Sequence, residues 1–386
     1  MCYTDVVQTR ALHSPSGEQR VRYRGEAVYL YAFDLAYEMT RVPVKTLAGQ
    51  PVADFVVDSS KRAPRQLFFY RPQTVRLPPL ERIGPLGPVR IERTVKILPV
   101  GGISIAVRVP FEVERLRDLI VFHDLTFSNG SLGHEVRALA DDLRLELAPY
   151  LIRAHDRLAE EEAYTVFCLE APLFQGADRT ELVEEWLAEQ RREIAALLTE
   201  ESDPDLLSRQ EVEESTSRHL SYSGHDLVIA DWNAALLLDE PRNFAEVLHL
   251  IELANLQLGE LEAYDRLLDD ALERAYRDLR SRELRSRATV LRELRELRID
   301  LARLSDELSN ITKFFGDWHH ARVYQAFAAR FHLADWQHSL DDKLKTLDHL
   351  YGMLAHDRTE RLMLILEVTI VLLFVVDLVM LFTRIR

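Results

Sequence analysis

Residues 239–268, DEPRNFAEVLHLIELANLQLGELEAYDRLL, decide the architecture that we expect for this chain. Asp239 is a suitable helix cap, and Pro241 is well placed in a first helical turn. From Val247 onward, apolar residues recur in alternating steps of four and three. A sustained heptad repeat of this kind is typical of a coiled-coil face. We therefore predict a first coiled-coil helix over residues 239–316.

The seam of this helix continues through a regular aliphatic series in its second half. This series consists of Leu294, Leu297, Leu301, Leu304, Leu308 and Ile311. A turn at Gly316 and a second helical pattern over residues 317–361 follow. Because a short connection between long helices favours antiparallel neighbours, we predict a long antiparallel helical hairpin. Packing of these helices between chains is the alternative, and it would make the protein a homo-oligomer.

The chain in front of the hairpin has the pattern of an α+β domain over residues 25–238, after a flexible arm at residues 1–24. Runs such as 26–35 (EAVYLYAFDL) and 89–98 (VRIERTVKIL) are rich in aromatic and β-branched residues, which is typical of strands. Helices are predicted over residues 111–125, 133–158 and 179–200. The predicted fold class is therefore an α+β N-terminal domain followed by the hairpin.

Residues 362–382, LMLILEVTIVLLFVVDLVMLF, form an apolar stretch near the end of the chain. As a helix it measures about 32 Å, which matches a hydrocarbon core of about 30 Å. We therefore predict one C-terminal transmembrane helix over residues 362–383. Its two acids, Glu367 and Asp377, each cost roughly 2.5–3.5 kcal/mol near the bilayer centre, which favours a functional role or a protein neighbour.

The start of the chain has no pattern of a secretory signal, and Cys2 and Cys168 are its two cysteines. These features favour a reducing compartment. We expect a single-pass protein of the cell inner membrane with a cytoplasmic N-terminal domain, or of the mitochondrial inner membrane in a eukaryote.

Charge is distributed unevenly along the chain. Residues 1–120 hold 18 basic and 12 acidic residues, whereas the remainder holds 30 and 51. A candidate basic patch surrounds the aromatic residues 68–70 and consists of Lys61, Arg62, Arg65, Arg71 and Arg76. Aromatic rings among cations are typical of single-stranded RNA binding. RNA or ribosome binding, contact with anionic lipid and an ordinary exposed strand face are the open alternatives.

Residues 324–377 resemble the membrane-anchoring end of the required-for-meiotic-nuclear-division (Rmd/Sif) family. The resemblance rests on Tyr324, Lys343-Leu344, the basic run DRTER at 357–361, Leu366-Glu367 and Asp377. It implies a membrane-tethered, non-enzymatic protein, and it provides no catalytic residues.

Catalytic motifs are absent from the sequence, which contains no Walker loop, CxxC pair, HExxH or G-x-S-x-G. Six of the thirteen histidines lie in the second predicted helix: His319, His320, His332, His338, His349 and His356. Their spacing does not allow one helix to gather them around a metal ion, so a solvated polar face is the preferred interpretation. We predict no enzymatic activity, no cofactor and no metal.

The predicted function is a tail-anchored membrane scaffold that assembles through its coiled coil and presents the α+β domain to a partner. The expected partners are the membrane and either further copies of the chain or another membrane protein, with nucleic acid as an alternative. Another candidate is an oligomeric ion channel similar to CorA-type transporters, because residues 351–353 (YGM) are similar to their Gly-Met-Asn signature. Leu354 stands in place of the asparagine, and one membrane helix stands in place of two.

Overall fold

The computed structural model describes residues 23–55, 72–127, 130–154, 161–171, 179–281 and 318–384, with isolated positions between 292 and 302. The strands of its main sheet are β1 (Tyr23–Asp34), β5 (Ala53–Asp54), β6 (Gln73–Gly84), β7 (Gly87–Ile97), β8 (Gly102–Val113), β12 (Glu162–Glu170), β13 (His219–Leu220), β14 (Leu227–Ala230) and β15 (Ala234–Asp239). Within the described residues this sheet has nine strands in the order β13-β14-β15-β12-β1-β8-β7-β6-β5. The pair of β12 and β15 is parallel, and the other pairs are antiparallel.

Three small two-stranded sheets accompany the main sheet. They pair β2 (Ala36–Met39) with β11 (Leu151–Ala154), β3 (Thr46–Leu47) with β4 (Gln50–Pro51), and β9 (Thr126–Phe127) with β10 (Gly130–Ser131).

Strand β1 lies at the centre of the main sheet and is buried on both faces. Tyr29 and Phe33 belong to one apolar core, whereas Val28 and Leu30 belong to the other. Successive side chains of a strand point to opposite faces, so an apolar run without polar interruption suits a strand covered on both sides. The strand predicted over residues 26–35 is confirmed.

The first face of the sheet is covered by helices α1 (Leu132–Leu147) and α2 (Arg179–Leu198), a 3-10 helix at Leu116–Phe122, and α3 (Arg209–Ser217), which packs on α2. The helix predicted over residues 111–125 is wrong in its first part, because β8 continues to Val113. Residues Val109, Phe111 and Val113 are buried and alternate with exposed neighbours. This period of two is the pattern of a strand.

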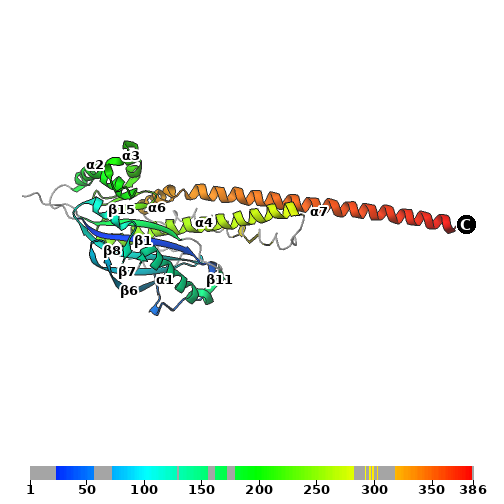
Figure 1. Ribbon diagram of the computed structural model, residues 1–386, viewed down its shortest axis with the longest axis horizontal. Coiled ribbons are helices and arrows are strands. Elements are labelled where there is room, and N and C mark those ends of the chain that lie inside the picture. The colour runs from blue at the N-terminus through cyan, green and yellow to red at the C-terminus, as the bar shows by residue number, and fades with distance from the viewer. Residues whose placement is uncertain are drawn as a thin grey trace, which may run out of the picture.

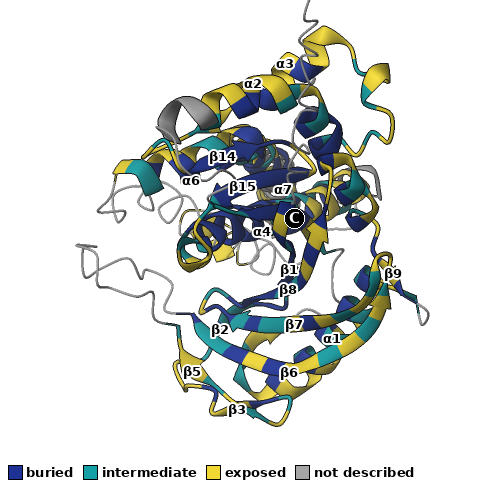
Figure 2. Cartoon of the chain, turned by 90° about the vertical axis from the view of Figure 1, so that its left-hand side faces the viewer, coloured by how far each residue is buried: buried dark blue, intermediate teal, exposed yellow. Residues whose placement is uncertain are grey.

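The second face is covered by helix α4 (Phe244–Ser281). Its residues from Val247 to Leu258 are buried on nearly every side, as the dark colour of α4 shows in Figure 2. One side packs on β1, β12 and β8, and the other packs on helices α6 (Trp318–Arg330) and α7 (Leu333–Arg384). The apolar repeat that predicted a coiled coil therefore serves largely to bury α4 within the domain.

The predicted long antiparallel hairpin is wrong. His320 near the start of α6 pairs with Glu246 near the start of α4, and Lys343 of α7 pairs with Asp265 and Asp269 further along α4. Both α6 and α7 thus run in the same direction as α4, and α7 continues beyond the end of α4 toward the C-terminus (Figure 1). The residues between Ser281 and α6 are numerous enough to bring the chain back to the domain. The predicted seam residues Leu294, Leu297, Leu301, Leu304, Leu308 and Ile311 lie outside the described residues.

The predicted membrane anchor is also corrected. In the part of the chain that the structure describes, no helix combines the length and the apolar character needed to cross a membrane. The transmembrane helix, the inner-membrane location, the tail-anchored scaffold and the CorA-like channel are therefore not supported.

A buried ionic cluster fixes α4 to the sheet. Lys96 of β7 forms an ion pair with Glu252 of α4, and the Ser104 hydroxyl of β8 donates a hydrogen bond of 2.6 Å to Glu252 Oε1. His249 Nδ1 lies 3.3 Å from Lys96 Nζ. Burial alone raises the pKa of Glu252, but Lys96 and His249 outweigh it and lower this pKa to about 2. The cluster stabilises a charged carboxylate under the helix.

A second polar contact fixes α6 to the edge of the sheet. Arg330, whose side chain is 8% exposed, forms ion pairs with Asp231 beyond β14 and, at 3.1 Å, with Glu214 of α3. The Tyr164 hydroxyl donates a hydrogen bond of 2.7 Å to the Asp231 carbonyl. The buried carboxylate of Asp231 would lose its charged partner if Arg330 were removed.

We expect the pH dependence of stability to change when Glu252 is replaced by Gln. The pKa of Glu252 is lower in the folded chain than in the unfolded chain, so its contribution is present above pH 5 and is lost as the pH falls toward 2. This contribution is about 3 kcal/mol. Urea unfolding of the wild type and E252Q between pH 2.5 and 7 measures it. Equal slopes of unfolding free energy against pH in both proteins contradict the assignment, and E273Q, at an exposed site of α4, is the control.

We expect Arg330→Met to lower the free energy of unfolding by about 3–5 kcal/mol, because it leaves a buried carboxylate unpaired. Arg322→Met, at an exposed position of the same helix, is expected to change it by less than about 0.5 kcal/mol. Urea titrations followed by tryptophan fluorescence compare the two variants. A similar small effect of both would show that Arg330 does not stabilise the docking of α6.

Candidate functional site

The main sheet splits between two neighbouring strands, β7 and β8. Their pairing runs from Ile97 opposite Ile103 to Glu92 opposite Arg108 and continues no further in the described residues. Beyond this point residues 87–91 of β7 pair with β6, and residues 109–113 of β8 pair with β1. Each strand therefore has a flank of five residues that faces the split.

Two features of β6 accompany the separation of β7 from β8. The register of β6 against β7 shifts between Leu77 and Leu80, as at a β-bulge, where Pro78 and Pro79 have no N–H to donate. A bulge bends its strand and increases the local twist. Arg82 of β6 then pairs with Glu135 of α1 at 3.3 Å. The hairpin of β6 and β7 is thus tied to α1, while β8 stays with β1.

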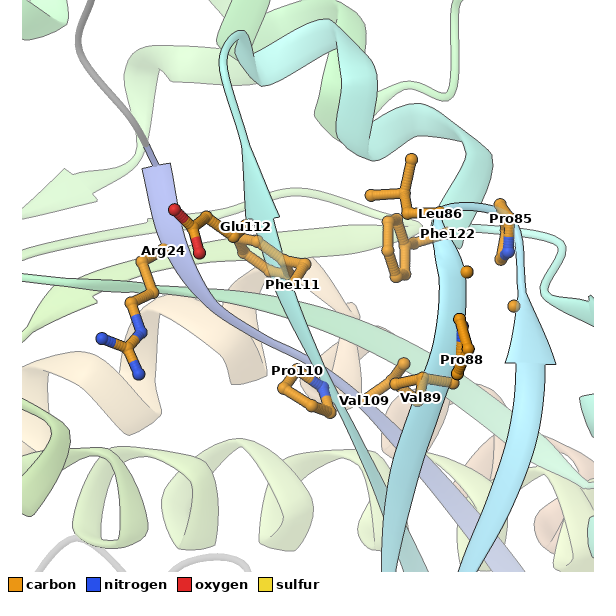
Figure 3. A pocket seen from close by; sticks show the side chains of 12 residues that line it. Arg24, Pro85, Leu86, Pro88, Val89, Val109, Pro110, Phe111, Glu112 and Phe122 are labelled. Carbon is orange, nitrogen blue, oxygen red and sulfur yellow. The ribbon is translucent and has the colours of Figure 1, made fainter.

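A pocket of about 350 Å³ occupies the split (Figure 3). Its base includes the rings of Phe111 and Phe122, whose centroids are 5.8 Å apart. The Tyr29 hydroxyl donates a hydrogen bond to the Phe122 carbonyl and fixes that end of the 3-10 helix. The lining residues are Arg24, Gly84, Pro85, Leu86, Gly87, Pro88, Val89, Val109, Pro110, Phe111, Glu112 and Phe122.

The pocket combines apolar side chains with backbone polar groups, and charged side chains lie at one side. Arg24 and Glu112 lie together away from the hairpin turn in Figure 3, and they are opposite each other in the register of β1 and β8. Arg24 Nε is 3.8 Å from Glu170 and its side chain is 72% exposed. Leu86, at the turn of the hairpin, is 58% exposed. The pocket thus offers apolar surface, strand flanks and one charged margin.

The predicted basic patch is only partly described. Arg76 is exposed on β6, whereas Lys61, Arg62, Arg65 and Arg71 lie outside the described residues. Two further basic residues of the described strands are engaged in contacts of their own. The largely covered Lys96 pairs with Glu252, and Arg93 donates a hydrogen bond of 3.3 Å to the Pro78 carbonyl. Among the described residues, Arg76 is therefore the member of the predicted patch that can be placed.

The remaining predicted residues form no common site in the described structure. Glu367 is exposed on α7, and Asp377 lies on the same helix with its side chain outside the described residues. His319 lies 3.8 Å from Asp226, and His332 pairs with Asp335 at 2.8 Å. Within the described part of the chain, no group of three or more His, Cys, Asp or Glu side chains is arranged to hold a metal ion.

The sequence contains two signals for the split that the pattern analysis did not use. The first is the pair Pro78-Pro79 inside an apolar strand pattern, because proline in a strand marks an edge or a bulge. The second is the segment GPLGP at 84–88, a turn that ends one strand and begins the next. Neither signal shows by itself with which neighbouring strand the backbone pairing ends.

Two comparisons with known proteins give matches in the N-terminal part of the chain. The family described as "Uncharacterized protein MJ0711, N-terminal domain" matches residues 24–245, which is more than half of the chain. The protein MJ0711 of Methanocaldococcus jannaschii is 24% identical over 226 residues, which cover 58% of this chain and 67% of that protein. No solved structure gives a significant match.

These matches overturn the predicted membership of the Rmd/Sif family. That resemblance rested on a few spaced residues in an apolar helix, a pattern that unrelated apolar helices also satisfy. The family match instead covers the sheet from β1 to β15, including both strands of the split. The chain belongs to the family of the MJ0711 N-terminal domain.

Proposed function

We propose that the protein is a non-enzymatic binding protein whose domain accepts an extended peptide segment of a partner protein between β7 and β8. The observation that carries this proposal is the split of the sheet, where the backbone pairing between the neighbouring strands β7 and β8 stops. An exposed strand edge is a template for one more strand, and added strands are a common mode of peptide recognition.

The backbone of the split favours an extended peptide as the ligand. Residues 109–113 of β8 would extend over about 17 Å, the length of a five-residue strand. Pro88 and Pro110, one on each flank, provide no N–H. The flanks are therefore incomplete templates, which limits uncontrolled pairing between copies while leaving room for a selected segment.

The side chains of the pocket favour a segment with apolar residues in its middle. Leu86, Val89 and Phe111 present aliphatic and aromatic surface to the split. A strand places alternate side chains on one face, so an apolar residue at every second position would fit this surface. The margin formed by Arg24 and Glu112 suits a polar or charged end of the same segment.

Binding explains the pocket better than catalysis does. Its titratable side chains are Arg24 and Glu112, and they lie at its margin rather than facing a nucleophile or an imidazole among the lining residues. General acid–base chemistry requires a positioned proton donor or acceptor beside the reacting group. Apolar side chains combined with backbone polar groups and a charged margin instead provide affinity and orientation for a ligand.

We expect Leu86→Asp to weaken binding of a selected peptide by at least 10-fold. Burial of a leucine side chain against a ligand contributes roughly 1.5–3 kcal/mol, and about 1.4 kcal/mol corresponds to a factor of ten. Ten-residue peptides are first selected on the full chain from a phage-displayed library. Fluorescence polarisation then measures the affinity of the selected peptides for both proteins.

The matched control for this variant is Ile83→Asp. Ile83 is 69% exposed on the same hairpin and does not line the pocket, so its replacement is expected to change affinity by less than about 2-fold. If the library yields no binding peptide, or if both variants weaken binding equally, the proposed site is wrong.

We also expect a selected peptide to slow hydrogen exchange of the non-proline amides within residues 87–91 and 109–113. Amides that face the split gain a partner when a strand is added, whereas the amides of β12 are already paired on both sides. Exchange measured by mass spectrometry with and without peptide tests this expectation. Protection confined to other regions of the domain would show that the peptide binds elsewhere.

A further inference from the structure

We infer that the segment bound between β7 and β8 is the amino-terminal segment of a partner protein, with its free ammonium group at the closed end of the split. This inference rests on the proposed peptide site and names the kind of peptide that the site takes. The closed end is the last backbone pair of the two strands, Glu92 with Arg108, and the open end lies at Gly87 and Val113.

The hydrogen bonds of the β7–β8 ladder show which backbone groups face the split. The Leu98 N–H donates a hydrogen bond of 3.0 Å to the Gly102 carbonyl, so these two residues form a bonded pair. Bonded and non-bonded pairs alternate along an antiparallel ladder. In the register of β7 and β8, the bonded pairs therefore recur at every second residue as far as Glu92 with Arg108.

Prolines occupy both of the next two bonded positions. At the same step, Arg90 would pair with Pro110, and Pro88 would pair with Glu112. Because proline has no N–H, each of these pairs could form one of its two hydrogen bonds. Pro88 and Pro110 stand on the two strands that border the pocket (Figure 3). The ladder therefore ends where its donors are missing.

The missing donors leave an excess of hydrogen-bond acceptors in the split. At the closed end the backbone groups are the Arg90 N–H and the carbonyl groups of Arg90 and Pro110. An internal peptide residue brings one N–H and one C=O, whereas a free amino terminus brings a cationic group with three N–H donors. The closed end therefore favours an ammonium group, and a carboxylate would meet two carbonyl oxygens there.

The geometry of the closed end also requires that an added strand ends there. Because β7 and β8 pair with each other from Glu92 and Arg108 onward, a segment in the plane of the sheet cannot pass beyond this pair. A segment with its amino terminus at the closed end runs antiparallel to β7 and leaves at the open end. Side-chain charges at the closed end are balanced, because Arg108 pairs with Glu26 at 2.8 Å. The exposed side chains of Arg90 and Glu92 carry one charge of each sign.

The test uses a ten-residue peptide selected on the full chain from a library displayed with a free amino terminus. Fluorescence polarisation compares the free peptide with one form acetylated at the amino terminus and another form amidated at the carboxyl terminus. We expect acetylation to raise the Kd by at least about 10-fold, because it removes the charge and two of the three donors. We expect amidation to change the Kd by less than about 2-fold.

A pair of proline variants tests where the ammonium group lies. Pro110→Ala supplies the N–H that the closed end lacks, and this N–H can pair with the Arg90 carbonyl. We expect this variant to bind the free peptide at least about 5-fold more weakly, and the effect of acetylation to fall below about 3-fold. The control is Pro85→Ala, in the turn between β6 and β7, which lines the same pocket away from the ladder positions. It is expected to change both quantities by less than about 2-fold.

Several outcomes overturn the inference. Equal affinity for the free and acetylated peptides excludes an ammonium group and leaves the proposed peptide site in place. Loss of affinity on amidation alone assigns the closed end to a carboxyl terminus instead. Equal effects of the two proline variants, with circular dichroism showing both to be folded, place the amino terminus away from the closed end. A selection that yields no peptide overturns the proposed function, and this inference with it.

Discussion

The first half of helix α4, from Val247 to Leu258, is rich in apolar side chains on almost every side and therefore has to be covered on almost every side. The sheet covers one side through β1, β8 and β12, and α6 and α7 cover another. This requirement determines the order of the layers, because α6 and α7 cover the side of α4 that the sheet leaves open. The carboxylate of Glu252 and the amino group of Lys96 then fix where along the sheet α4 rests. A buried pair of this kind contributes more to the choice of one arrangement than to the total stability.

The half of the sheet that contains β7 and β8 differs from its centre in how completely its strands are paired. Around β1 every strand has two neighbours, and the backbone groups are paired as a folded domain demands. Between β7 and β8 the pairing stops, and the cost of separating the strands is offset by contacts of the hairpin with α1, such as Arg82 with Glu135. A domain keeps an opening of this kind most easily where neighbouring elements hold both of its sides. The split therefore lies between the β6–β7 hairpin, which contacts α1, and β8, which stays paired with the centre of the sheet.

The sequence predicts the individual elements of this fold better than their arrangement. The aromatic and β-branched run of β1 and the alternation in β7 are local signals, and both strands lie where these patterns placed them. The apolar repeat of α4 is equally clear, but a helix buried between a sheet and two helices has the same repeat as a coiled coil. The direction of α7 relative to α4 depends on the long connection between them, which sequence periodicity does not describe.

The position of the pocket depends on where the pairing of β7 with β8 ends. This end is set by a bulge in β6 and by contacts with α1, which is distant in sequence. Composition also failed for the C-terminal stretch and for the basic patch, because counting residue types does not show which side chains share a surface.

Helix α7 is continuous from Leu333 to Arg384, and its described contacts with the domain lie along its first part, from Lys343, which meets Asp265 and Asp269, to the buried Leu350. Beyond Leu350 the helix extends as an arm of about 51 Å, so a tilt of 5° at the start of this arm would displace its end by about 4 Å. A small shift of α4 on the sheet would be amplified in this way into a larger displacement at the far end. The geometry of the chain thus connects the interior of the domain mechanically to whatever its tip contacts.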